Sequence, residues 1–207
     1  MLIAGVDEVG RGPLAGPVVA AVAVFEEGYI NPEIGDSKKL SPKKRENLIE
    51  IIKHDAVSWA IVAVGHNRIT KLNIREASRL AMALALKRVK ADRVLVDGNV
   101  PIETNLPQET IVGGDNLRVE IGAASILAKV WRDNLMVVLD NKYPGYGLGK
   151  HAGYPTKTHR EAIITLGPCK IHRQAFRGVK EYLKGGIKGA EEQLPFEGAF
   201  PFASGYR

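Results

Sequence analysis

Two adjacent acids stand close to the start of the chain, at the end of an apolar stretch. Residues 2–6 read LIAGV and are followed by Asp7 and Glu8. Such a stretch predicts a β-strand, and the sequence VGRGP at residues 9–13 breaks the pattern at once. Two carboxylates at a strand end, beside the open backbone amides of a glycine-rich turn, indicate a site for a metal ion and a phosphate.

Two further acids follow signals that place them at the same edge of a sheet. Residues 93–97 read RVLVD, a short strand that ends in Asp97 and follows a helical pattern, so it is expected to run parallel to a neighbour. If that neighbour is the first strand, Asp7 and Asp97 both lie at carboxyl ends, where open α/β sheets bind ligands. Asp115 ends a Gly-Gly-Asp turn. Carboxylates suit Mg²⁺, and two ions about 4 Å apart can drive phosphodiester cleavage.

The strands and helices that must position these acids alternate along the chain. Residues 18–25 should form an antiparallel hairpin with the first strand, and Ser41 and Asn73 should cap helices. In chain order, the predicted elements are strands at 2–8 and 18–25, a helix at 42–54, a strand at 57–64, a helix from 73 to about 89, strands at 93–97 and 109–112, and a helix at 119–141.

The net charge of +6 comes from one C-terminal segment. Residues 1–141 carry 18 Lys and Arg against 18 Asp and Glu, whereas residues 142–188 carry 10 against 2. Within this segment we expect a glycine-rich binding loop at 143–154, a short helix capped by Thr158, and an amphipathic stretch at 172–183. Concentrated positive charge indicates a polyanion partner such as nucleic acid; the alternative is a solvated face.

Length and composition predict one domain with a tail. We place the domain at residues 1–183 and the tail at 184–207. No apolar run reaches the roughly 18–20 residues of a membrane span, and no signal peptide precedes the first strand, so a cytoplasmic, monomeric protein is expected. Cys169 is the only cysteine and can form no internal disulfide.

Five motifs, taken in order, resemble the ribonucleases of the HII type. They are IAGVDEVGRGP, DSKKLS, VLVDG, GGD followed by AASILAKVWRD, and GYPTKTH, and the likeness spans residues 2 to about 180. The resemblance implies an α/β, ribonuclease H-like fold: a five-stranded mixed sheet, three antiparallel strands then two parallel ones, flanked by helices, with a C-terminal helical segment at 142–183. It also implies an endonuclease of DNA replication and repair that cuts the RNA strand of RNA–DNA hybrids and cuts duplex DNA at single embedded ribonucleotides.

The resemblance also implies a role for individual residues. The family's four metal-binding, catalytic carboxylates fall on Asp7, Glu8, Asp97 and Asp115. They would hold two Mg²⁺ or Mn²⁺ ions, and cleavage would leave 3′-hydroxyl and 5′-phosphate ends. The substrate-reading elements fall on Gly10, Arg11, Gly12 and Tyr154. Backbone groups of the glycine turn and the tyrosine would together recognise the ribose, since the 2′-hydroxyl is what distinguishes RNA from DNA at that sugar.

Several basic residues are predicted to contact phosphate groups of the substrate. They are Lys38, Lys39, Lys129, Arg132, His172 and Arg173. Each could instead be an exposed charge. His172 is also a possible general base, although two-metal chemistry requires none, and close packing is the expected role of Ser125 among its neighbouring alanines.

The tail has a loose likeness to the short C-terminal peptides by which some replication enzymes dock on a sliding clamp. The likeness lies in Gln193, Phe196, Phe200 and Phe202. Ala199 stands where that pattern requires its first aromatic residue. Packing of these aromatics on the domain, or disorder, is the alternative.

Three other functions fit part of the pattern. A dinucleotide-binding turn at residues 10–16 is disfavoured because that motif must open a helix, whereas Pro13 and the next apolar run predict a strand. A nucleic-acid-binding module without catalysis leaves the acids unexplained, because carboxylates repel phosphate unless a metal intervenes. A different nuclease on the same fold would also cluster acids, but Arg11 between glycines and Tyr154 argue against it. The sequence therefore favours a metal-dependent endoribonuclease.

Overall fold

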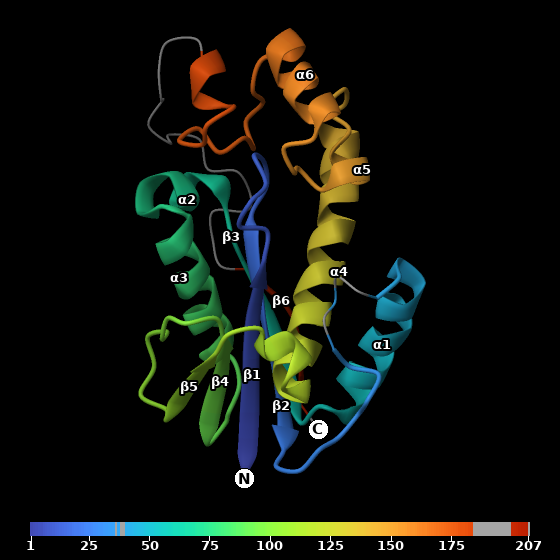
Figure 1. The fold of residues 1–207 in the computed structure, drawn as a ribbon, viewed down its shortest axis with the longest axis vertical. Coiled ribbons are helices and arrows are strands. Elements are labelled where there is room, and N and C mark those ends of the chain that lie inside the picture. The colour runs from blue at the N-terminus through green and yellow to red at the C-terminus, as the bar shows by residue number, and fades with distance from the viewer. Residues whose placement is uncertain (36, 38–39, 184–199, 207) are drawn as a thin grey trace.

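A mixed β-sheet runs through the middle of the molecule (Figure 1). The computed structural model describes residues 1–35, 37, 40–183 and 200–206. In these residues the strand order is β5-β4-β1-β2-β3-β6. The first five strands are β1 (Leu2–Val9), β2 (Val18–Glu26), β3 (Ser58–Val64), β4 (Arg93–Asp97) and β5 (Gln108–Ile111). β1, β2 and β3 pair antiparallel, while β4 pairs parallel with both β1 and β5, which confirms the predicted five-stranded arrangement.

The sheet has a sixth strand that the sequence did not predict. β6 (Phe200–Tyr206) pairs antiparallel with the outer edge of β3. A free strand edge offers unpaired backbone groups to an extended segment, so part of the predicted tail belongs to the sheet. Gln193 and Phe196 lie outside the described residues, and the clamp-docking hypothesis stays a prediction.

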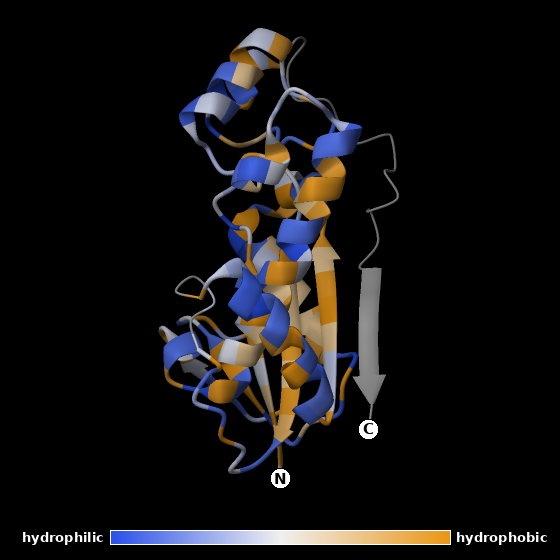
Figure 2. Cartoon of the chain, turned by 90° about the vertical axis from the view of Figure 1, so that its right-hand side faces the viewer, coloured by the Kyte–Doolittle hydropathy of each residue, from blue (hydrophilic) through white to orange (hydrophobic). Residues whose placement is uncertain are grey.

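Helices cover both faces of the sheet (Figure 1). α2 (His66–Leu72) and α3 (Ile74–Leu86) lie on one face, and α1 (Pro42–Asp55) and α4 (Val119–Lys142) lie on the other. Both faces of β2 are apolar and buried. Figure 2 shows the hydrophobic colour of the central strands. No helix in the described part of the chain has the length and apolar character needed to span a membrane.

Two of the three predicted helix caps are present in the structure. The Ser41 hydroxyl accepts a hydrogen bond from the backbone N–H of Lys44, and the Asn73 side chain caps α3. α2 was not predicted, because its seven residues carry too few apolar positions to show a period. The predicted cap at Thr158 is wrong: α6 (Lys157–Leu166) begins earlier, and Thr156 caps it by accepting from the N–H of His159 at 3.2 Å.

The C-terminal segment packs beyond the end of the sheet, against the far end of α4 (Figure 1). It contains α5 (Leu148–His151) and α6, joined to α4 by an apolar cluster that includes Leu14, Met136 and Ile163. Residues 172–183, expected as an amphipathic stretch of the helical segment at 142–183, have only the short 3₁₀ turn η2 (Lys180–Tyr182) as helical structure. The reason is that this backbone pairs with residues 14–16 instead: His172 bridges Ala15, and the Arg173 N–H donates to the Leu14 carbonyl at 2.8 Å.

β1 and α4 touch backbone to backbone at Gly5. A Cβ atom on Gly5 would lie 2.1 Å from the carbonyl carbon of Glu120 and 2.3 Å from the nitrogen of Ile121. Both neighbours are main-chain atoms, so no side chain can move aside. This close approach places the start of α4 over the strand that ends in Asp7 and Glu8.

Gly5→Ala is therefore expected to destabilise the protein by about 3 kcal/mol or more, the cost of forced overpacking. Thermal unfolding should show a melting temperature lower by about 6–12 °C. Gly35→Ala is the matched control, because no atom lies within 4 Å of the point that a Cβ on Gly35 would occupy. Equal melting temperatures for the two variants would contradict the packing assigned to Gly5.

Candidate active site

Three of the predicted acids lie at the carboxyl ends of two adjacent parallel strands. β1 and β4 are paired in register up to Val6 and Val96, and Asp7 and Asp97 are the next residues on each strand. Glu8 follows Asp7, and its backbone N–H donates to Asp7 Oδ1 at 2.6 Å. The expected parallel pairing of these strands is confirmed, and it brings the acids to one edge of the sheet.

The carboxylates at this edge repel one another in a buried environment. Asp7 is 6% exposed, and its pKa is raised well above the usual range by burial, then by the charges of Glu8 and Asp97. Burial also raises the pKa of Glu8; Arg11 opposes this effect, and Asp97 adds to it. Arg11 Nη1 lies 3.4 Å from Glu8 Oε1, but its side chain is 57% exposed, so it neutralises the cluster only in part.

The turn that carries Asp115 is bonded to the same edge of the sheet through the backbone of Gly114. The N–H of Gly114 donates to Asp97 Oδ1 at 2.8 Å, which fastens the turn η1 (Gly114–Asn116) to the end of β4. Asp115 is buried in this turn, and its Oδ1 accepts from Asn116 Nδ2 at 3.0 Å. The four acids therefore lie on adjoining elements, and three of them interact electrostatically.

The donor set suits a hard divalent cation. In the described part of the chain, no three side chains of the His, Cys, Asp or Glu type are already arranged around a metal position. The acids nevertheless supply only oxygen donors, which Mg²⁺ and Mn²⁺ prefer. A bound cation would also relieve the burial and like-charge effects that raise the pKa of Asp7.

Ser125 affects the acid Asp7, a role that the sequence did not predict. Its hydroxyl opposes the rise in the pKa of Asp7, and its Oγ lies 2.9 Å from Ser37 Oγ. Both serines are buried. Ser125 thus links the DSKKLS connector to the acid cluster, and a serine among alanines on a helix gives no sign of this in the sequence.

A buried arginine holds the glycine turn that follows β1. Arg173 is 0% exposed, and its guanidinium donates to the carbonyls of Gly10, Arg11 and Gly16. The peptide bonds are all trans in the described chain, so each carbonyl points opposite to the N–H of the next residue. Because the Gly10 and Arg11 carbonyls face Arg173, the N–H groups of Arg11 and Gly12 point away from it.

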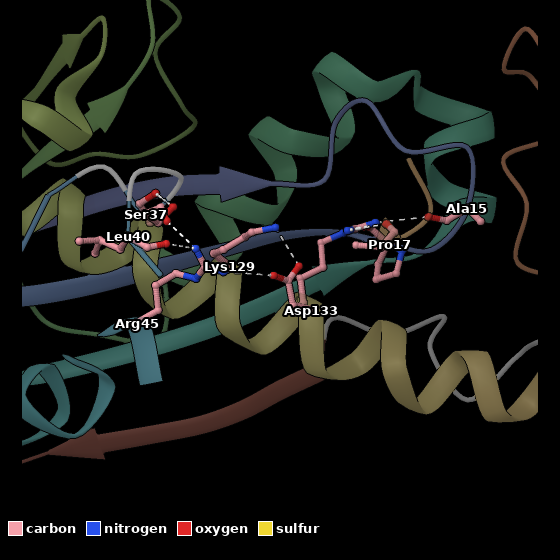
Figure 3. Close-up of polar contacts among 10 residues, drawn as sticks. Ala15, Pro17, Ser37, Leu40, Arg45, Lys129 and Asp133 are labelled. Carbon is pink, nitrogen blue, oxygen red and sulfur yellow. Dashed lines mark hydrogen bonds and ion pairs between the residues drawn. The ribbon is translucent and has the colours of Figure 1, made fainter. Parts of the chain in front are cut away.

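A second buried arginine, Arg132 on α4, holds the rest of this loop. Its guanidinium donates to the carbonyls of Ala15, Pro17 and Ala152, and Figure 3 shows the contacts to Ala15 and Pro17. Burial lowers the pKa of Arg132 to about 10, so the group stays protonated at neutral pH. Arg132 therefore joins the N-terminal loop to the C-terminal segment.

Tyr154 lies against the glycine turn. A Cβ atom on Gly12 would be 3.5 Å from the ring carbon Cε1 of Tyr154, an ordinary van der Waals contact. The Arg132 guanidinium lies 6.0 Å from the centre of the Tyr154 ring. Tyr154 is 37% exposed, so part of the residue packs on the protein and part of it reaches solvent.

The predicted phosphate contacts of Arg132, His172 and Arg173 are wrong. All three side chains are 0% exposed. Their polar atoms are used inside the protein, the arginines by loop carbonyls and His172 by His159 and Cys169. A general-base role for His172 is excluded by the same burial. Lys38 and Lys39 lie outside the described residues.

Lys129 lies in a groove beside Tyr154. The groove is lined by residues of α1, α4 and α5, including Arg45, Asp133 and Lys150. Lys129 Nζ pairs with Asp133 Oδ1 at 2.9 Å, and Arg45 Nη1 donates to the carbonyls of Ser37 and Leu40 (Figure 3). A phosphate contact by Lys129 stays a prediction, and it would compete with Asp133.

Comparisons with known proteins agree on one family. The model of the family described as Ribonuclease HII matches residues 4–179. The ribonuclease HII of Syntrophotalea carbinolica is 49% identical over 183 residues, covering 87% of this chain and 88% of that protein. The ribonuclease HII of Syntrophus aciditrophicus is 51% identical over 178 residues, covering 85% and 84%.

Two solved structures have the same fold. The ribonuclease H2 of Pyrococcus horikoshii matches with a TM-score of 0.75 and 27% identity, covering 88% of this chain and 97% of that one. The ribonuclease HII of Archaeoglobus fulgidus, solved in a complex with PCNA, matches with a TM-score of 0.73 and 26% identity, covering 86% and 96%.

In the presence of chelator, Asp7→Asn is expected to stabilise the protein by about 1–2 kcal/mol, or to raise the melting temperature by about 2–8 °C. A raised carboxyl pKa in the folded state costs stability once the pH exceeds the value of the unfolded chain, about 3.9. The difference should therefore shrink as the pH falls towards that value. Adding Mg²⁺ or Mn²⁺ should stabilise the unmodified protein more than the variant.

Differential scanning calorimetry with chelator and with each metal measures both effects. Glu27→Gln, at an exposed acid in the turn after β2, serves as the control and should change neither. Equal stabilisation of the unmodified protein and Asp7→Asn by the metals would contradict the assignment of Asp7 as a ligand.

Arg173→Lys is expected to destabilise the protein by about 3 kcal/mol, because a single ammonium group cannot reach three carbonyls that the guanidinium holds together. Urea unfolding measures this difference. Arg177→Lys is the matched control, since Arg177 lies in the same segment and is exposed. A difference below about 0.5 kcal/mol between the two variants would show that the loop does not depend on Arg173.

Proposed function

The chain belongs to the ribonuclease HII family, and from this premise we propose that it cuts the RNA strand of RNA–DNA hybrids and cuts duplex DNA at single embedded ribonucleotides. As a member of the family it is a metal-dependent endoribonuclease with a ribonuclease H-like fold. The proposal concerns which substrates it recognises, how many ions it uses, and which ends it leaves.

The observation that carries the proposal is that the acids and the tyrosine meet at one turn. Asp7 and Glu8 end β1, the glycine turn follows within two residues, and the ring of Tyr154 contacts the position of Gly12. A sugar seated at this turn would lie between backbone N–H groups and a tyrosine ring, beside the acids. This supports recognition of a single ribose, because only the 2′-hydroxyl distinguishes it from deoxyribose.

The chain's own residues prepare the turn for such a sugar. The Arg173 guanidinium binds the carbonyls of Gly10 and Arg11. In trans peptide bonds the N–H groups of Arg11 and Gly12 consequently point away from Arg173. Donors fixed in this way would bind a hydroxyl or phosphate oxygen without reorganising. The same backbone can thus orient the scissile phosphate next to the acids.

We assign the acids as the ligands of two Mg²⁺ or Mn²⁺ ions. The four ligands are Asp7, Glu8, Asp97 and Asp115. When bound, such ions activate a water molecule and stabilise the leaving oxygen of a phosphodiester. Hydrolysis would leave 3′-hydroxyl and 5′-phosphate ends. The burial and mutual repulsion of Asp7, Glu8 and Asp97 favour binding of cations at this position.

The wider setting of the enzyme stays a set of predictions. We propose that it acts in DNA replication and repair, in the cytoplasm and as a monomer. The relative from Archaeoglobus fulgidus was solved in a complex with PCNA, which supports docking of the tail of this chain on a sliding clamp.

The cleavage assay compares three labelled duplexes: DNA with one internal ribonucleotide, an RNA–DNA hybrid, and DNA alone. With Mg²⁺ or Mn²⁺ we expect cleavage of the first two at the ribonucleotides, and no cleavage in chelator. Asp7→Asn should abolish turnover. Cleavage of all-DNA duplex at the same rate, or cleavage in chelator, would overturn the proposal.

Tyr154→Ala should lower cleavage at the single ribonucleotide by about tenfold or more, the equivalent of roughly 1.4 kcal/mol of lost contact. Tyr154→Phe, which keeps the ring, should lose less. Cleavage of the continuous hybrid should fall less in both variants, because neighbouring ribonucleotides supply further contacts. Tyr182→Ala removes an exposed tyrosine far from the turn in sequence and is the control. An equal loss on every substrate would contradict the role of Tyr154.

A further inference from the structure

Two buried histidines connect the C-terminal segment to the backbone of Tyr154. His159 lies on α6 and His172 lies in the segment that follows it, and both are 0% exposed. Their Nε2 atoms are 3.1 Å apart. His159 Nδ1 lies 3.0 Å from the Tyr154 carbonyl, and His172 Nδ1 lies 3.0 Å from the backbone nitrogen of Cys169. The two rings therefore form a continuous chain of hydrogen bonds from Cys169 to Tyr154.

The two ends of this chain determine where its protons lie. The Tyr154 carbonyl can only accept, so His159 must carry its proton on Nδ1 and accept through Nε2. His172 must then donate from Nε2, which leaves its Nδ1 to accept from the Cys169 N–H. The Cys169 carbonyl, at 3.3 Å from the same nitrogen, is the longer contact. Each ring nitrogen of the pair is thus satisfied in one arrangement only.

Both histidines are neutral in this arrangement. Burial lowers the pKa of His159, and it lowers the pKa of His172 to about 4. The groups that surround the pair are His151, whose ring stacks on His159 at 4.6 Å between centres, Tyr146, whose ring lies 5.0 Å from His172, and the Cys169 thiol, 3.1 Å from His172 Nδ1. No carboxylate is among these contacts, so nothing in them favours a charged imidazole.

The residues just before Tyr154 are bonded to the rest of the protein, since the Leu14 N–H donates to the Gly153 carbonyl at 2.8 Å and Arg132 donates to the Ala152 carbonyl. The backbone of Tyr154 itself has few other contacts within the described residues. It lies between the short helix α5 and the start of α6, and Pro155, the next residue, has no N–H to donate. The neighbouring turn bonds run from Tyr154 N–H to the His151 carbonyl at 2.9 Å and from Thr156 N–H to the Tyr154 carbonyl at 2.8 Å. The His159 bond is the contact that ties this carbonyl to a buried group on another element.

We propose that His159 and His172 are positioning residues that hold Tyr154 against the glycine turn and so set the enzyme's discrimination of ribonucleotides. The inference rests on the role proposed above for Tyr154. The pair acts through the Tyr154 backbone and touches neither the acids nor the substrate. Loss of the His159 bond would leave the ring free to move away from Gly12, and a single ribonucleotide would lose more than a continuous hybrid.

The first test is independent of activity. NMR spectra of protein with ¹⁵N-labelled histidine should show His159 protonated on Nδ1 and His172 protonated on Nε2 at neutral pH. His54, whose side chain is 74% exposed and whose Nδ1 lies 2.8 Å from Asp55 Oδ1, is outside the pair and provides the reference signal. Observation of the Nε2–H tautomer for His159, or of a charged ring for either histidine, would overturn the proposal.

The second test compares two substitutions of the same histidine. His159→Asn keeps a donor near the Nδ1 position, whereas His159→Leu removes it at similar volume. We expect His159→Leu to lower kcat/KM at a single ribonucleotide about tenfold relative to the hybrid, and His159→Asn to restore most of this ratio. His54→Leu, the control, should leave the ratio unchanged. A loss that is equal on both substrates, or equal in both variants, would show a merely structural role.

A double-variant cycle separates this inference from the proposed function. If His159 acts through Tyr154, adding Tyr154→Ala to His159→Leu should lower the ratio no further, whereas additive losses would overturn the positioning role. If Tyr154→Ala alone leaves cleavage at the single ribonucleotide unchanged, the proposed role of Tyr154 is rejected. If Tyr154→Ala lowers that cleavage and the losses of the two variants add, only the positioning role of the histidine pair is rejected.

Discussion

The glycine turn depends on two buried guanidinium groups whose hydrogen bonds go to loop carbonyls. Removing a charge from water is costly unless every donor is satisfied, and Arg132 and Arg173 meet this demand with loop carbonyls. Because a guanidinium is planar and presents its donors in a fixed fork, it imposes one arrangement on the carbonyls that it binds. The conformation of the turn after β1 is therefore specified by residues more than a hundred positions away in sequence.

In the acid cluster, unlike at the buried arginines, like charges lie close together. Asp7, Glu8 and Asp97 are brought together at the strand ends although their mutual repulsion and burial oppose ionisation. The buried arginines do not relieve this repulsion, because their donors are turned towards backbone carbonyls. The protein thus places positive charge that is fully bonded to carbonyls beneath the turn and mutually repelling carboxylates beside it. A cation or a proton at these carboxylates would relieve the repulsion.

The features that depend on local sequence patterns, namely the strands and most of the predicted caps, could be predicted from the sequence. The contacts between side chains that are far apart in the sequence could not. The five strands, the caps at Ser41 and Asn73 and the parallel placement of Asp97 beside Asp7 followed from apolar period and from the rule that strands separated by a helix run parallel. Arg132, His172 and Arg173 were misread as surface phosphate contacts because charged residue types are usually exposed. The role of Ser125 was missed because the apolar period of a helix does not reveal which residues of the neighbouring strand its side chains face.

The burial of Arg173 and His172 also changes what the basic C-terminal segment does. Among the described Lys and Arg residues of this segment, only Arg173 is buried, and it holds the glycine turn. The others form an outer group that includes Lys157, whose side chain is 90% exposed. Only the outer group can contact the phosphates of a nucleic acid directly, since Arg173 is buried and bound to loop carbonyls. The same segment can therefore fix the tyrosine and the turn through its buried residues while its exposed basic residues are free of that task. This arrangement explains why one short stretch is both strongly basic and rich in buried polar contacts.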